Sequence, residues 1–140
     1  MSDKKPNAST IEVRISVVKT CAQLEIDRQD AYIQESVRKH AEQQIKYREE
    51  YNQKFFVKLF KKQKPVPTVD ERAQEIIDEF NSGSYDWMSS AYDPLRRQGT
   101  VWYKRLHQLA GLYDSSEFST MRLSIEDADL IEYNEYAPKV

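Results

Sequence analysis

A single cysteine, Cys21, and three glycines stand in this chain of 140 residues. One cysteine excludes a disulfide within the chain, so we expect a reducing compartment. The two histidines, His40 and His107, lie too far apart for a Cys/His zinc site. No run approaches the ~18 apolar residues of a membrane-spanning helix, and the first residues lack the apolar core of a secretion signal. We therefore predict a cytoplasmic protein without a transmembrane segment.

Motifs for catalysis are also missing. The chain has no glycine-rich phosphate loop, no Gly-x-Ser-x-Gly and no His-Glu-x-x-His. Glu126, Asp127 and Asp129 lie close in sequence, but no glycine-turned calcium loop frames them. Cys21 falls on an apolar helical stripe, which is typical of a small core residue. We predict that the protein is not an enzyme, has no catalytic residue and binds neither a cofactor nor a metal.

Glycine and proline are unevenly distributed. Neither occurs between Asn7 and Lys64, whereas all three glycines and three of the five prolines fall between Pro65 and Gly111. Both residue types interrupt helices. The length predicts one domain, residues 9–140, after a flexible tail at 1–8. Within it we expect a long helical arm at 9–64 and a half made of short helices at 65–140.

The arm is rich in Gln, Glu, Lys, Arg and Ala, which are good helix formers. One helix of 40–50 residues would be about 60–75 Å long, too long to be buried in a domain of this size. Either it projects and pairs with a second copy, or it breaks near 27–30 into a helical hairpin. Asp30, His40 and Gln44 fall at positions that would be apolar in a coiled coil, which favours the hairpin.

The first residues of the arm fit two structures. Ser9 and Glu12 have the spacing of a helix capping box, and the apolar stripe beyond continues in phase, so we favour helix for 10–18. The alternative is a strand, because β-branched residues alternate with polar ones over 11–17. Residues 119–125 alternate too, and the two segments would form a small sheet.

Short helices are predicted after the arm. Thr68 and Glu71 have capping-box spacing and precede an apolar stripe that Gly83 ends. Thr100 caps a further helix that stops around Gly111, and Ser124 starts a last one. The predicted fold is mainly α, with a long N-terminal helix or helical hairpin packed against three to four shorter helices. The alternative is an α+β fold with the small sheet from 11–17 and 119–125.

The first candidate surface is the run 51–64, which has five lysines and no acidic residue. On a helix, four lysines would share one face beside an apolar face of Phe55, Phe56, Leu59 and Phe60. Such a helix could contact phosphates, lie on an anionic membrane or dock in the groove of a partner protein. In the simpler interpretation the phenylalanines fill the core while the lysines are solvated.

The second candidate run, 94–110, combines arginines with Trp102 and Tyr103 and also lacks acidic residues. That combination suits phosphate contact and base stacking, although a core helix with basic residues in its last turn would look the same. If the two runs fold side by side, they form one basic patch. The segment 113–136 is acidic and carries tyrosines that could anchor a protein interface.

These features favour a non-enzymatic interaction protein that binds, and regulates or inhibits, another protein. A small accessory factor encoded by a virus or a mobile element would have this composition, and the arm could make it a homo-oligomer. The alternative is a nucleic-acid-binding module that uses 51–64 and 94–110, although a pI near 5.8 is low for such a module. The predicted partner-binding residues are Lys54, Phe56, Lys58, Phe60, Lys61, Lys62, Arg96, Arg97, Trp102, Arg105, Tyr133 and Tyr136.

Overall fold

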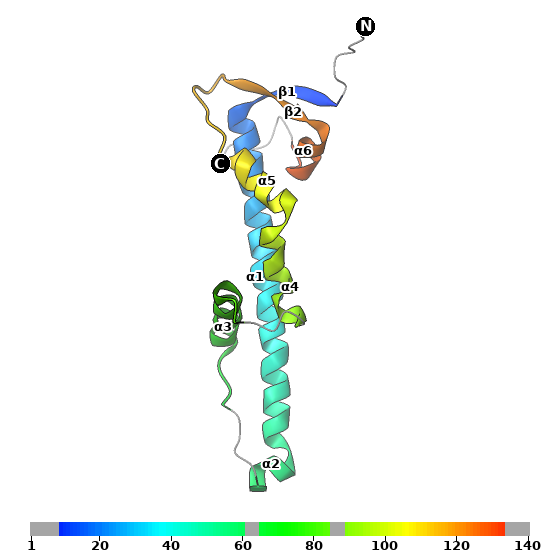
Figure 1. The fold of residues 1–140 in the computed structure, drawn as a ribbon, viewed down its shortest axis with the longest axis vertical. Helices are drawn as coiled ribbons and strands as arrows, with labels where there is room; N and C mark the ends of the chain where they lie inside the picture. Colours follow the sequence, from blue (N-terminus) through cyan, green and yellow to red (C-terminus); the bar gives the residue numbers. More distant parts are fainter. Residues whose placement is uncertain (1–8, 61–64, 85–88, 134–140) are drawn as a thin grey trace. The chain divides into compact units, whose positions relative to one another are not determined.

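The computed structural model describes residues 9–60, 65–84 and 89–133, and within them only the backbone of Phe55 and Phe56. Most of these residues are helical (Figure 1). The elements in chain order are β1 Thr10–Arg14, α1 Ile15–Gln53, α2 Phe55–Phe60, α3 Val69–Ser82, the 3-10 turn η1 Ser90–Tyr92, α4 Asp93–Arg96, the 3-10 turn η2 Arg97–Gly99, α5 Val101–Ala110, β2 Thr120–Ser124 and α6 Ile125–Leu130. The prediction of a mainly α fold is confirmed, together with the small sheet of its alternative.

Helix α1 is one unbroken helix of 39 residues, seen as a continuous blue-to-cyan ribbon in Figure 1. The prediction of a hairpin broken near 27–30 is wrong. The aspartates at the two ends of this segment, Asp27 and Asp30, both have side-chain partners. Asp27 accepts a hydrogen bond from the Gln23 amide at 3.0 Å, and Asp30 accepts one from the Tyr103 hydroxyl at 2.6 Å. Their carboxylates therefore do not compete for backbone groups, which is how aspartate weakens helices.

The helix favoured for residues 10–18 begins only at Ile15, so that interpretation is wrong for residues 10–14. β1 pairs antiparallel with β2, with Val13 opposite Met121 and Ile11 opposite Leu123. Ser9 is not a helix cap, since its carbonyl accepts from the Ile125 amide at 2.7 Å. The strand indicated by alternating apolar and polar residues forms here instead of the capped helix, because β2 supplies a partner strand and the apolar face of the pair is packed. The strand is shorter than the predicted 11–17.

The chain divides into two compact units: Met1–Asp30 with Gly99–Val140, and Ala31–Gln98. In the first unit the inner face of the sheet packs on the start of α1 and on α5. The buried core of this unit consists of Val13, Val18, Cys21, Ala22, Ile26, Leu106, Leu109, Leu123 and Ile131. Cys21 is a small core residue, as its position on the apolar stripe predicts.

In the second unit, α3 is tied to α1. Arg38 of α1 pairs with Asp70, and the Arg72 guanidinium donates to the Gln44 side chain at 2.6 Å. The predicted capping box is present, with the Thr68 side chain bound to the Glu71 amide and the Glu71 side chain bound to the Thr68 amide. Gly83 ends α3 with a φ of 77°, a left-handed conformation that glycine adopts without strain.

Candidate functional site

The most exposed apolar residues of the second unit lie where α1 ends. The chain turns at Lys54, whose amide donates to the Tyr51 carbonyl at 3.2 Å, and continues at once as α2. In Figure 1, α2 is drawn at the C-terminal end of α1. Val57 is buried, at 3% exposed, while Leu59 is 57% and Phe60 69% exposed. The interpretation that places the phenylalanines in the core fails for Phe60.

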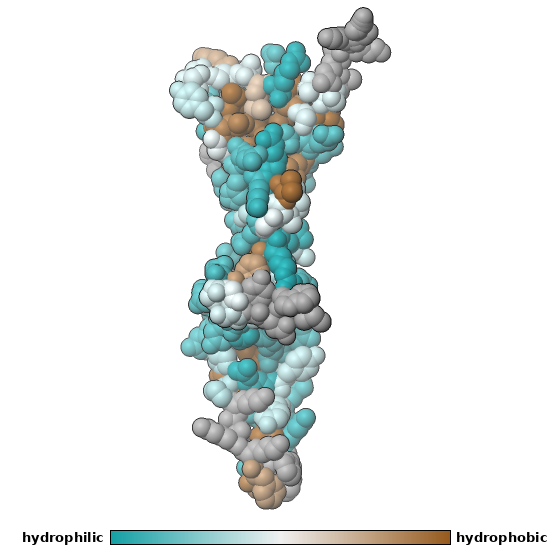
Figure 2. All heavy atoms as spheres, viewed as in Figure 1, coloured by the Kyte–Doolittle hydropathy of each residue, from teal (hydrophilic) through white to brown (hydrophobic). Residues whose placement is uncertain are grey.

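Basic and aromatic residues that precede these two in the sequence are exposed as well. Lys54 and Lys58 are exposed on the same helical turn, and the Lys58 amide donates to the Lys54 carbonyl at 3.1 Å. Seven residues before Lys54, Tyr47 is 61% exposed on α1. We call Tyr47, Lys54, Lys58, Leu59 and Phe60 the tip surface. Figure 2 shows hydrophobic atoms at the surface at this end of α1.

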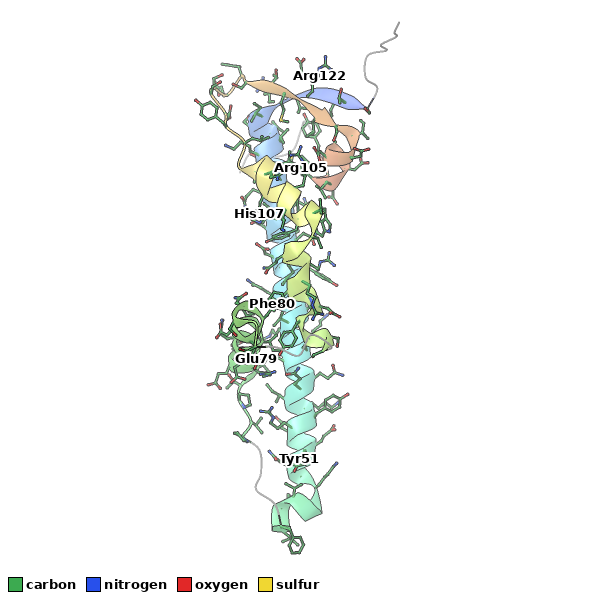
Figure 3. The ribbon with its side chains drawn as sticks, viewed as in Figure 1. Tyr51, Glu79, Phe80, Arg105, His107 and Arg122 are labelled. Atoms are coloured by element: carbon green, nitrogen blue, oxygen red, sulfur yellow. The ribbon has the colours of Figure 1, made fainter. Side chains whose placement is uncertain are left out.

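A shallow hollow of about 280 Å³ adjoins the tip surface on α1. Gln44, Tyr47, Arg48 and Tyr51 line it, and Figure 3 labels Tyr51 near the end of the helix. The Gln43 amide donates to the Tyr47 hydroxyl at 3.2 Å, which orients that ring along the helix. The sequence interpretation missed Tyr47 and left Leu59 out of the binding set. The Tyr47/Tyr51 spacing of one helical turn was a signal for the hollow.

A second hollow lies between α1 and α3 and measures about 520 Å³. Its walls combine Ala31, Val37 and Ala73 with the Arg38–Asp70 pair, which raises the pKa of the Arg38 guanidinium through a hydrogen bond. These polar groups already have each other as partners. Arg38 and Asp70 are therefore already engaged and would have to leave each other to orient a small ligand.

A polar network lies inside the same unit. Tyr92 donates to Glu79 at 2.7 Å, and Arg72 pairs with Glu79 at 3.2 Å. Glu79 and Phe80 extend from α3 toward these partners (Figure 3), and Phe80 stacks on Tyr92 at 6.4 Å. Burial lowers the pKa of Arg72, but its hydrogen bonds to Glu75 and Glu79 outweigh that effect and raise it overall. The network holds α3 and η1 together and shows the features of a structural site.

The arginines of the second basic run are engaged within the protein. Arg96 pairs with Asp93, and the Arg97 guanidinium lies over the Tyr32 ring at 4.7 Å. Arg105 makes two hydrogen bonds to the Asp127 carboxylate, at 3.3 and 2.7 Å, and the pKa of Arg105 is raised mainly by this contact. Figure 3 labels Arg105 on α5. Phosphates would have to compete with these carboxylates.

The second unit contains the first basic run and the start of the second run, and these parts do not form one patch. Arg97 contacts Tyr32, and Lys54 directly follows Gln53, the last residue of α1. Tyr32 and Gln53 are 21 residues apart on that helix, which corresponds to about 32 Å at ~1.5 Å per residue. Arg96 and Arg97 therefore belong to a different surface from the tip.

The remaining predicted anchors divide into two groups. Trp102 and Tyr133 are half-buried and pack against the core of the first unit, so they contribute to folding there. Among the acidic residues, Asp127 is paired with Arg105, and Glu132 with Arg28 at 2.8 Å. Lys61, Lys62, Tyr136 and the Phe56 side chain lie outside what the structure describes.

In the described part of the chain, no group of three or more His, Cys, Asp or Glu side chains is placed to hold a metal ion. Among the described helices, none combines the length and the apolar character needed to cross a bilayer. Comparison of the chain with protein-family models, with curated proteins and with solved structures found no match in any of the three.

Proposed function

We propose that this chain is a non-enzymatic interaction protein that binds another protein through the tip surface. One observation carries the proposal: Leu59 and Phe60 are 57% and 69% exposed on a helix that buries Val57. Exposed large apolar side chains that gather on one surface are typical of docking sites. Aromatic residues are enriched among the anchors of protein interfaces, and Tyr47 adds a second ring.

The charges of the tip surface indicate the chemistry of the partner. Lys54 and Lys58 are exposed just before the apolar pair in the chain, so the partner should present an apolar pocket with acidic residues on its rim. Such complementarity speeds encounter and fixes orientation, while the apolar contact supplies most of the affinity. We propose that this binding regulates or inhibits the partner.

The experiment is affinity capture from an extract of the cells in which the chain is naturally made, followed by mass spectrometry. It compares the wild type with Leu59→Ser/Phe60→Ser and with the matched control Val101→Ser/Tyr113→Ser. The control also removes one exposed aliphatic and one exposed aromatic residue, but from the first unit. A partner retained by the wild type and the control but lost from the tip variant supports the proposal. Equal capture by all three proteins contradicts it.

Fluorescence anisotropy with labelled single- and double-stranded nucleic acid tests the alternative function. Five phosphate contacts would give a log–log salt slope of about −4.5 on duplex. We expect no binding of that kind, because Arg96 and Arg105 are already paired with carboxylates. Tight binding with such a slope, lost in Lys54→Glu/Lys58→Glu, would replace the protein-binding proposal with a nucleic-acid-binding one.

A further inference from the structure

Among the residues that the structure describes, the sheet of the first unit has two strands, so each of them has an outer edge. The amide of Ile15 donates to the Ser119 carbonyl at 2.9 Å, and the amide of Ile125 to the Ser9 carbonyl at 2.7 Å. In an antiparallel pair, hydrogen-bonded positions alternate along each strand. The odd-numbered residues of β1 therefore bond to β2. Glu12 and Arg14 turn their backbone N–H and C=O groups to the outer edge.

The side chains of Glu12 and Arg14 lie on the outer face of the sheet. Val13 between them is buried on the inner face, and both charged residues are exposed. Glu12 is opposite Arg122 of β2 in the register. The Arg14 guanidinium lies over the Phe118 ring at 5.9 Å, which keeps it beside the strand. The outer edge of β1 thus carries one acidic and one basic residue, two positions apart.

We propose that two copies of the chain associate by antiparallel pairing of their β1 strands about Val13. In this register Glu12 of each copy lies opposite Arg14 of the other. Both residues turn their backbone groups to the outer edge, as the hydrogen-bonded positions of a new antiparallel ladder must. Charges of opposite sign attract each other when their residues face each other on neighbouring strands. The dimer would contain a four-stranded sheet in the order β2, β1, β1, β2.

Other pairings of the same edges are less favourable. A shift of the register by two residues places Glu12 opposite Glu12 of the second copy, and like charges at opposite positions repel. The outer edge of β2 carries Arg122 at its centre and no acidic residue. Two β2 edges paired about that residue would place arginine opposite arginine. Charged residues on an edge strand, such as Arg122, are one way in which proteins protect that edge from pairing with other strands.

The size of the contact sets its strength. A strand of five residues buries much less than the ~1,200 Å² of stable interfaces. We therefore expect a monomer–dimer equilibrium that depends on concentration. The association would extend the sheet from two strands to four. The tip surface belongs to the other unit.

The experiment is sedimentation velocity on the full chain from about 10 μM to about 1 mM, the range of weak interfaces. Glu12→Arg and Arg14→Glu each place like charges opposite one another in a homodimer, and each should weaken dimerisation at least tenfold. An equimolar mixture of the two variants restores both opposite pairs. We expect the mixture to dimerise as well as the wild type, with one copy of each variant per dimer by native mass spectrometry.

Further variants keep the test decisive. The double variant Glu12→Arg/Arg14→Glu should dimerise with itself, and Arg122→Gln on β2 should leave dimerisation unchanged. Circular dichroism and thermal melts establish that each variant is folded. A wild type that stays monomeric up to the highest concentration would overturn the proposal, as would a mixture that stays monomeric. Growth beyond dimers that Arg122→Gln abolishes would also overturn it, because it would mean that β1 pairs with β2 of the next copy.

Discussion

At the scale of single residues, exposure separates structural from interacting side chains on α2. Val57, Leu59 and Phe60 are all apolar and lie within one turn of the helix, but only Val57 is buried. Helical periodicity in the sequence places the four lysines and the apolar residues on neighbouring faces. It does not say which part of the apolar face is covered, because that depends on the direction in which α2 turns after Lys54.

Val57→Ala and Leu59→Ala test this separation. Val57→Ala should lower the free energy of unfolding by about 2 kcal/mol, since it removes two buried methyl groups and leaves a cavity. Leu59→Ala, the matched control at an exposed position, should change it by less than about 0.5 kcal/mol. Urea denaturation followed by circular dichroism measures both. A large loss for Leu59→Ala would mean that the tip surface is buried.

Tyr103 gives a pH-dependent prediction. Its hydroxyl donates to Asp30 at 2.6 Å, and burial together with this contact raises the pKa of Tyr103 from 10.0 to about 12. Tyr103→Phe should cost about 1–2 kcal/mol at neutral pH. Between pH 10 and 12 the unfolded chain loses the tyrosine proton that the folded chain still holds. The advantage of the wild type is therefore complete below pH 10 and declines as the pH rises toward 12.

Urea denaturation of the wild type and Tyr103→Phe at pH 8, 10 and 11 measures this difference. The exposed Tyr113 supplies the control, because Tyr113→Phe should not change stability at any of these pH values. A difference between the wild type and Tyr103→Phe that stays constant up to pH 11 would contradict the raised pKa.

At the scale of elements, the ends of the helices follow the local sequence closely. Thr68, Thr100 and Ser124 each bind the backbone amide three residues ahead, as their spacing predicts. The start of α1 does not follow its local signal. Ser9 and Glu12 have the same spacing as Thr68 and Glu71, but residues 10–14 pair with β2 instead. A distant strand outweighs a local cap there, because it packs Val13 and Leu123 into the core.

The C-terminal end of α3 offers a pair of matched glycine substitutions. Gly83 has a φ of 77°, whereas Gly99 does not have a positive φ, and a Cβ at either position would meet no atom within 4 Å. Gly83→Ala should cost about 1–2 kcal/mol, because an L-residue is strained in the left-handed region. Gly99→Ala should be neutral or slightly stabilising, since it restricts the unfolded chain. Thermal unfolding of both variants is the measurement, and equal stabilities would contradict the left-handed end of α3.

The continuity of α1 is also testable at this scale. Backbone chemical shifts from nuclear magnetic resonance should be helical without interruption from residue 25 to residue 32. The reason is that Asp27 and Asp30 are held by side chains rather than by their own backbone. Loss of helical shifts at 27–30 would restore the hairpin that the sequence favoured.

At the scale of the whole molecule, the two proposed contacts belong to different units. The tip surface lies in Ala31–Gln98, and β1 lies in Met1–Asp30 with Gly99–Val140. Residues in separate compact units with no shared partner should act independently. Leu59→Ser/Phe60→Ser should therefore dimerise with the same dissociation constant as the wild type in sedimentation velocity. A change of more than about tenfold, ~1.4 kcal/mol, would mean that the tip surface takes part in self-association.

The sequence by itself determined the mainly helical class, the caps of α3, α5 and α6, and the amphipathic run at the end of the arm. These features depend on neighbours within four residues, and such interactions are present in the local sequence. The tertiary structure decided the rest. It made residues 10–14 a strand by supplying β2, kept α1 whole by giving Asp30 a partner 73 residues away, and engaged the arginines of the second run with acidic and aromatic side chains. It also left Leu59 and Phe60 exposed, because burial depends on which elements meet, and local spacing carries no record of that.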